Sequence, residues 1–155
     1  MYKRQALYIL QKQYKETCNG EVKDFASTAY DGPNYTAYES YFTELKNQGL
    51  VTLKVKNYKK GKSTASITHT KLAIQKYNLG TGFNSFKIDL LKFIPKQISG
   101  ISYSDEGNRA VILFTGDYVP TPFYKIKAKK TRCHKSKNIE RKATFVRYDT
   151  GWRLE

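Results

Sequence analysis

Residues 33–70 read PNYTAYESYFTELKNQGLVTLKVKNYKKGKSTASITHT, and the change of pattern within this stretch decides the predicted fold. Pro33 suits the first turn of a helix, because an N–H at that position would have no partner within the helix. Tyr38, Phe42 and Leu45 follow at four- and three-residue spacing, which places them on one apolar face. The stretch therefore begins as an amphipathic helix.

The second half of the stretch predicts a β-hairpin. Gly49 is typical of the position just beyond a helix end, because glycine adopts the left-handed conformation without strain. From Val51 the apolar residues recur with a period of two, and Thr52 and Lys54 fall on the opposite face. The lysine-rich residues 59–63 predict a turn, and residues 64–70 predict the return strand.

Helical patterns flank this stretch on both sides. Residues 2–20 carry apolar residues at helical spacing up to a stop signal at Asn19 and Gly20. Residues 21–30 predict a short amphipathic helix, and residues 71–79 predict another after the hairpin. The expected order is helix, helix, helix, strand, turn, strand, helix.

This order resembles the winged helix-turn-helix family of DNA-binding proteins over about residues 4–78. The likeness depends on the stripe of Tyr38, Phe42 and Leu45, followed by QGLV at 48–51 and a basic hairpin. In that family the third helix enters the major groove and the hairpin contacts the flanking backbone. The resemblance therefore implies the same roles for helix 33–48 and for the basic hairpin 54–64. The many tyrosines of the helix depart from the family, which more often has Arg, Ser and Thr there.

The second half of the chain predicts a separate small domain. Glycine and polar residues at 80–85 suggest a joint, and FKIDLLKFIPKQI at 86–98 has helical apolar spacing before Pro95. The remaining segments, including 121–130, predict an antiparallel β-meander that faintly resembles an NTF2-like cone. We therefore predict an α+β protein with a winged helix-turn-helix over 1–80, then a domain of one helix and a β-meander over 81–155.

The charge of the chain indicates a polyanionic partner. The sequence has 28 Lys/Arg against 13 Asp/Glu, a net charge of +15, and the surplus is spread over both halves. A hydrophobic fraction of 39% with 13 Tyr and 8 Phe argues against a disordered basic tail. A folded protein with this charge is expected to bind nucleic acid.

Two sets of residues are the predicted DNA contacts. The hairpin lysines suit phosphate oxygens, although a solvated turn is the alternative; they are Lys54, Lys56, Lys59, Lys60 and Lys62. The outward face of the helix offers polar side chains for bases and phosphates, although a face that only meets water is the alternative; its members are Asn34, Tyr35, Thr36, Glu39, Ser40 and Thr43. Because this helix has no Arg, we expect modest base reading.

A second basic cluster lies at 125–142. Its predicted contact residues are Lys125, Lys127, Lys129, Lys130 and Arg132. Two interpretations are equally open: a second nucleic-acid surface, or a charged sheet edge that prevents association with other sheets.

The cysteines and carboxylates do not predict catalysis. Cys18 and Cys133 are too few for a disulfide framework or a zinc motif, which favours a reducing, cytoplasmic setting. Cys133 and His134 are neighbours in sequence and would point to opposite faces of a strand. No carboxylates are paired by a motif, so we predict no enzyme, no metal site and no cofactor. No apolar run has membrane length.

These observations predict a double-stranded DNA-binding protein that regulates transcription. The C-terminal domain would form a homodimer, bind a protein partner or a ligand, or add DNA contacts. A role in replication or in a mobile element fits equally well. The alternatives are a protein-interaction module on the same scaffold, and RNA or single-strand binding by exposed tyrosines beside a basic track.

Overall fold

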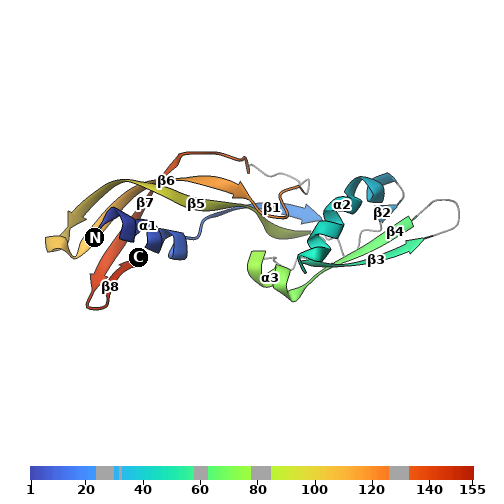
Figure 1. Ribbon diagram of the computed structural model, residues 1–155, viewed down its shortest axis with the longest axis horizontal. Helices are drawn as coiled ribbons and strands as arrows, with labels where there is room; N and C mark the ends of the chain where they lie inside the picture. Colours follow the sequence, from blue (N-terminus) through green and yellow to red (C-terminus); the bar gives the residue numbers. More distant parts are fainter. Residues whose placement is uncertain (24–29, 32, 58–62, 78–84, 126–132) are drawn as a thin grey trace. The chain divides into compact units, whose positions relative to one another are not determined.

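The computed structural model describes residues 1–23, 30–31, 33–57, 63–77, 85–125 and 133–155. These residues form an α+β protein with three α-helices and mostly antiparallel strands (Figure 1). The helices are α1 (Lys3–Gln13), α2 (Pro33–Asn47) and α3 (Lys71–Tyr77). The strands are β1 (Thr17–Lys23), β2 (Tyr30–Asp31), β3 (Val51–Asn57), β4 (Ser63–His69), β5 (Ser85–Ser104), β6 (Arg109–Pro120), β7 (Ile139–Tyr148) and β8 (Gly151–Leu154).

The strands form two sheets. The larger one has the order β1-β5-β6-β7-β8, and the smaller one has the order β2-β4-β3. Asp105–Gly107 form a short 3₁₀ turn between β5 and β6. The predicted strands of the C-terminal meander are thus confirmed at β6, β7 and β8.

The chain divides into two compact units of discontinuous sequence. Unit 1 consists of Met1–Cys18, Leu91–Thr121 and Cys133–Glu155, and unit 2 consists of Asn19–Leu90 and Pro122–Arg132. This division differs from the predicted 1–80 and 81–155, because helix α1 belongs with the C-terminal strands. Strand β5 runs through the boundary between Leu90 and Leu91.

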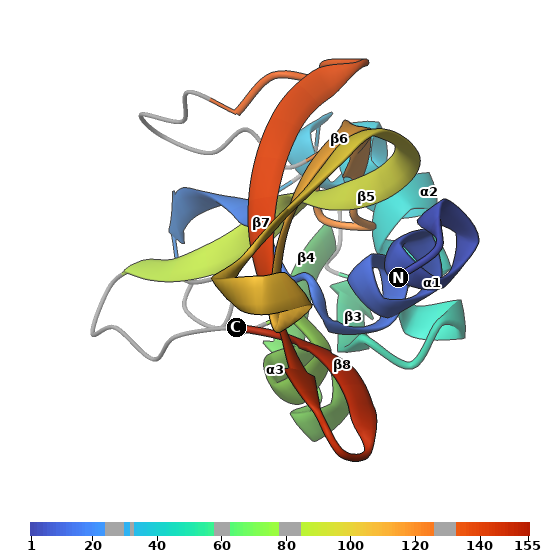
Figure 2. The same cartoon turned by 90° about the vertical axis from the view of Figure 1, so that its left-hand side faces the viewer.

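The core of unit 1 lies between α1 and one face of its sheet (Figure 2). Ala6 and Leu10 of α1 are fully buried, and alternate residues of β6 meet them from the sheet. Tyr14 lies edge-on against Phe114, with ring centroids 5.1 Å apart. Edge-to-face pairs of this kind add to the stabilisation from apolar burial.

Strand β5 accommodates a proline by means of a bulge. Its register with β6 shifts between Pro95 and Gln97, and Gly116 is the β6 partner of Pro95. A Cβ atom at Gly116 would lie 2.5 Å from the carbonyl oxygen of Ile94 and from Phe93 Cζ. Only glycine therefore permits the close packing of these two strands.

The core of unit 2 lies between α2 and the smaller sheet. Phe42 is 1% exposed and Leu45 is fully buried, which confirms the predicted inward face of this helix for the two residues. As expected, Gly49 lies just beyond the end of the helix in the left-handed conformation, with φ of 69°. Leu50 N–H donates to the carbonyl of Leu45, and Gly49 N–H donates to that of Lys46, as in a Schellman motif.

Two predicted helices are wrong where the structure describes them, and the helix predicted over 2–20 ends earlier, at Gln13, with 17–20 in strand β1. In the segment 21–30, residues 21–23 and 30 are strand, and 24–29 lie outside the described residues. The segment 86–98 lies within β5, because pairing with β6 and β1 decides the conformation of a short apolar run. The winged-helix arrangement is therefore not confirmed.

The predicted strand at 121–130 is also wrong at its start. Pro122–Lys125 form turns, and residues 126–130 lie outside the described residues. Pro120 is the last residue of β6, where it is paired with Leu91, and Pro122 lies in the turn that follows. Neither proline has an N–H to donate to a further ladder. Phe123 is instead fully buried, with its ring 5.2 Å from that of Tyr77.

Candidate nucleic-acid interface

The β3–β4 hairpin presents a polar, basic outer face. Residues of β3 that alternate with the apolar ones pair with hydroxyl residues of β4: Thr52 with Thr68, Lys54 with Ser66 and Lys56 with Thr64. Thr52, Lys54 and Thr68 are exposed, whereas Val51 and Ile67 of the other face are buried. The alternation thus places hydroxyl and ammonium groups together on one side of the hairpin.

Thr70 fixes the base of the hairpin to the helices that flank it. Its N–H donates to the carbonyl of Leu50 at 3.1 Å, and its hydroxyl donates to the carbonyl of Gly49 at 2.7 Å. The same hydroxyl oxygen accepts a hydrogen bond from Ala73 N–H at 3.3 Å and so caps α3. The hairpin is therefore held at one end by a defined set of bonds.

The hairpin lies within a long stretch that has no acidic residue. Residues 45–88 contain nine lysines and no aspartate or glutamate. Five of these lysines are exposed in the described part of the chain, namely Lys46, Lys54, Lys71, Lys76 and Lys87. None of the five forms an ion pair with a carboxylate among the residues that the structure describes. Their charge is thus open to an external anion.

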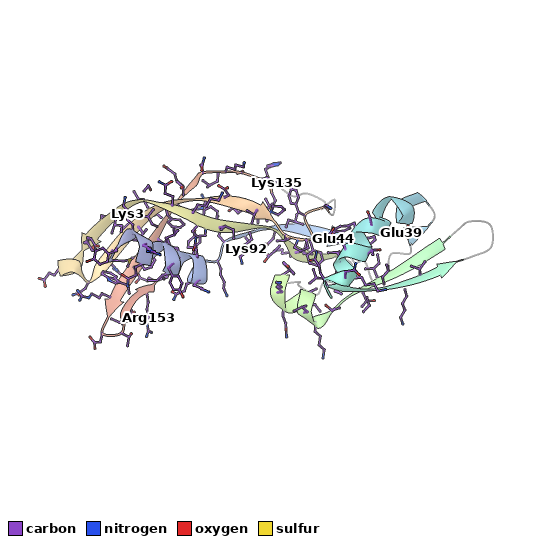
Figure 3. All side chains as sticks on the ribbon, in the orientation of Figure 1. Lys3, Glu39, Glu44, Lys92, Lys135 and Arg153 are labelled. Atoms are coloured by element: carbon purple, nitrogen blue, oxygen red, sulfur yellow. A yellow bond between two sulfur atoms is a disulfide. The ribbon has the colours of Figure 1, made fainter. Side chains whose placement is uncertain are left out.

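The outward face of α2 is less favourable to DNA than predicted. Glu39, Ser40 and Thr43 are exposed as expected, but Glu44 is also exposed and lies 3.8 Å from Lys125 (Figure 3). Lys46 is the one base on the described outward face, which therefore carries two carboxylates against one ammonium group. The side chains of Asn34, Tyr35 and Thr36, in the first turns of α2, lie outside the described residues.

Tyr41 is a structural residue and does not contribute to the outward face. It is 6% exposed, and its hydroxyl donates to the carbonyl of Pro122 at 2.9 Å. This bond joins α2 to the turn at 122–125 within unit 2. The tyrosine content of α2 is thus explained in part by packing.

The other predicted contact residues are described only in part. Lys56 is placed in β3, but its side chain lies outside the described residues, as do Lys59, Lys60 and Lys62. In the second basic cluster Lys125 is exposed beside Glu44, and the remaining four predicted members lie outside the description: Lys127, Lys129, Lys130 and Arg132.

The two cysteines form a disulfide, which corrects the expectation of unpaired thiols. Cys18 and Cys133 are separated by 115 residues in sequence, and their Cα atoms are 5.6 Å apart. Pairing over that distance is set by the tertiary fold and has no local sequence signal. Cys133 therefore has no thiol available as a nucleophile, and the argument for a reducing compartment no longer holds.

Glu16 forms a charged cluster in unit 1 that the sequence does not reveal. Arg141 binds the carboxylate through two nitrogens, with Nε 2.8 Å from Oε2 and Nη2 2.7 Å from Oε1. The hydroxyls of Tyr14 and Tyr118 also donate to this carboxylate. The Arg141 guanidinium lies over the Phe93 ring, 5.4 Å from its centroid.

This cluster shifts the pKa of each of its members. Hydrogen bonds from Arg141 hold the pKa of Glu16 at about 2, against 4.5 for an ordinary glutamate, despite the opposing effect of burial. Burial, aided by the hydrogen bond to Glu16, raises the pKa of Tyr14 to about 12. The bond to Glu16 likewise raises the pKa of Arg141. Arg141 is thus committed to Glu16 and adds no free charge to the second basic cluster.

Comparison with protein-family models, with curated proteins and with solved structures found no match to this chain. Within the described residues, no helix is long and apolar enough to cross a membrane. The same part of the chain contains no group of three His, Cys, Asp or Glu side chains that could hold a metal ion.

Proposed function

We propose that this chain binds double-stranded DNA, with the lysines of unit 2 as its principal phosphate contacts. The observation that carries the proposal is the acid-free stretch 45–88, whose exposed lysines lie on β3, α3, the end of α2 and the start of β5. Each lysine that meets a phosphate releases condensed counterions, and this release drives association.

The hairpin suits contact with a phosphate backbone. Lys54 is exposed and paired with Ser66, while Thr52 and Thr68 add hydroxyl groups to the same face. Hydroxyl and ammonium groups are both common donors to phosphate oxygens, and such contacts position a protein without reading sequence.

The contribution of α2 is confined to its first turns. Asn34, Tyr35 and Thr36 carry no charge, and their place at the N-terminal end of the helix favours an anion. Further along, Glu39 and Glu44 would repel phosphates. Unit 2 is thus expected to bind DNA with little base reading, and regulation of transcription is the role we propose for it.

The test compares three nucleic acids of one sequence: duplex DNA, single-stranded DNA and single-stranded RNA. We expect the duplex to bind most tightly, with the logarithm of affinity falling linearly against the logarithm of salt concentration. Changing Lys59, Lys60 and Lys62 to Ala in one variant should reduce the steepness of that slope by about 0.9 for each phosphate contact that is lost.

Tighter binding to either single strand would favour the RNA or single-strand interpretation instead. Affinity that is independent of salt for all three nucleic acids would remove the electrostatic basis of the proposal and favour a protein partner.

A further inference from the structure

Helix α1 in unit 1 presents an outward face that carries no acidic residue. Its inward side is fixed by Ala6 and Leu10, which are fully buried against the sheet. Arg4, Tyr8 and Lys12 recur at four-residue spacing on the opposite side, and all three are exposed, Tyr8 to 63%. Gln5 is exposed beside Arg4.

No carboxylate in the same stretch of sequence compensates the positive charge of this face. Residues 1–15 contain Lys3, Arg4, Lys12 and Lys15 and no carboxylate. The next residue, Glu16, is held by Arg141, Tyr14 and Tyr118. Lys12 Nζ lies 5.9 Å from the Tyr8 ring centroid, a contact that leaves its charge intact.

The helix is also firmly supported at both ends. The amino group of Met1 donates to the Tyr103 hydroxyl at 2.9 Å, and that hydroxyl donates back to the Met1 carbonyl at 2.8 Å. Gln11 Nε2 donates to the carbonyl of Pro95 at 3.1 Å. Figure 3 shows Lys3 at the start of this anchored helix. A helix held in this way presents its outward side chains in a preorganised arrangement.

We infer that α1 is a base-reading helix, which inserts its outward face into the major groove of double-stranded DNA. Arginine can bind both acceptors of guanine and glutamine can bind the edge of adenine, so Arg4 and Gln5 have the chemistry to read bases. Lys12 and Lys15 would contact phosphates. A helix about 10–12 Å wide fits a major groove that is about 12 Å wide.

This inference rests on the proposed function and adds sequence selection to it. It assigns to α1 the guanine-binding arginine that α2 lacks. The described outward face of α2 carries Glu39 and Glu44, whereas that of α1 carries no carboxylate.

The experiment selects bound sequences from a random duplex pool with the full chain and four variants. We expect the wild type to enrich a motif that contains guanine. Arg4→Ala and Gln5→Ala should each lose preference at one position and weaken binding to the selected duplex by about 5- to 100-fold. Lys3→Ala removes the same charge as Arg4→Ala at a position rotated by about 100°. Lys3→Ala should weaken binding to duplexes of every sequence equally and leave the selected motif unchanged.

Thr43→Ala, on the outward face of α2, is the matched control and should also leave the motif unchanged. All four side chains are exposed, so an unaltered unfolding midpoint is expected for each variant. An unchanged motif in Arg4→Ala and Gln5→Ala, or a motif altered by Thr43→Ala, overturns the inference. Salt-dependent duplex binding without any motif overturns it while the proposed function stands, and absence of duplex binding overturns both.

Discussion

Unit 1 and unit 2 carry similar numbers of basic residues but compensate them differently. Unit 1 has 13 Lys/Arg and 7 Asp/Glu, and unit 2 has 15 and 6. Among the described side chains of the larger sheet, three bases form ion pairs: Arg141 with Glu16, Lys96 with Asp117 and Arg109 with Glu155. In unit 2 the lysines of β3 and α3 have no carboxylate in their own elements, and the adjoining strand β4 contains none either.

This difference separates bases that stabilise the fold from bases that are available to a partner. The Arg141 guanidinium is partly buried, hydrogen bonded and stacked on aromatic rings, so removing it would disturb the sheet. Lys54 is exposed beside hydroxyl groups, so removing it should affect binding alone. Total charge therefore indicates the class of partner, and local compensation indicates which residues meet it.

The largest expected effects come from the two cores. Phe42→Ala in unit 2 and Phe114→Ala in unit 1 should each cost roughly 3–5 kcal/mol in the free energy of unfolding, because each removes a buried ring. Hydrogen exchange read by mass spectrometry should show the loss of protection mainly in the mutated unit: in β3–β4 for Phe42→Ala, and in β6–β7 for Phe114→Ala. Ser40 lies two residues before Phe42 on α2 and is exposed, so Ser40→Ala should change the free energy of unfolding little.

Equal loss of protection in both units from either substitution would contradict the division into units. A small effect from Phe42→Ala, similar to that of Ser40→Ala, would mean that α2 faces the other way.

The disulfide should have the next largest effect. Reduction of Cys18–Cys133 opens a loop of about 115 residues, and loss of such a bond typically costs about 2–4 kcal/mol. Denaturant unfolding with and without a phosphine reductant measures this cost. The Cys18→Ser, Cys133→Ser double variant should match the reduced wild type and show no response to reductant. Two free thiols in the untreated protein would contradict the pairing.

Glu16→Gln should remove roughly 2 kcal/mol at neutral pH, since Arg141 and two tyrosines lose a charged partner. The pH dependence gives a second test. The folded pKa of Glu16 is about 2, below the ordinary value of 4.5, so its contribution is fully present above pH 4.5 and is lost as the pH falls towards 2. Unfolding midpoints between pH 6 and 2 should therefore fall more steeply for the wild type than for Glu16→Gln.

Glu140→Gln, at an exposed position of β7, should leave the wild-type pH profile in place. If Glu16→Gln and the wild type lose stability in parallel over this range, other carboxylates account for the acid sensitivity.

The features that the sequence predicts well are those fixed by local interactions. The α2 helix follows from its apolar stripe and from Gly49, and the hairpin follows from the change to a period of two. The strands β7 and β8 lie within the segments predicted to form the β-meander. The exposed position of Lys54 is predicted for the same reason, since alternation decides the face.

The failures occur where distant residues decide the structure. The run at 86–98 has apolar spacing that suits a helix or a strand, and its partner β6 begins more than ten residues later. The Pro95 that suggests a helix end is instead absorbed by a bulge. The pairing of Glu16 with Arg141 spans 125 residues and that of Cys18 with Cys133 spans 115, so neither leaves a local pattern.

The smallest expected effects provide the sharpest comparison of the two units. Lys54 and Lys142 are both exposed strand lysines, paired across a ladder with Ser66 and Leu113 respectively. Lys142 shares its face of β7 with Glu140, two residues away, whereas neither β3 nor β4 contains a carboxylate.

Changing either lysine to Ala should alter the free energy of unfolding by less than about 0.5 kcal/mol, because both side chains lie in solvent. Their effects on DNA binding should differ. Lys54→Ala should reduce the slope of log affinity against log salt by about 0.9, the value for one lost phosphate contact. Lys142→Ala should leave the slope unchanged, because Glu140 already offsets its charge and repels phosphate. Equal reductions from both variants would show that DNA responds to the total charge of the chain. Local compensation would then no longer distinguish the surface of unit 2 from that of unit 1.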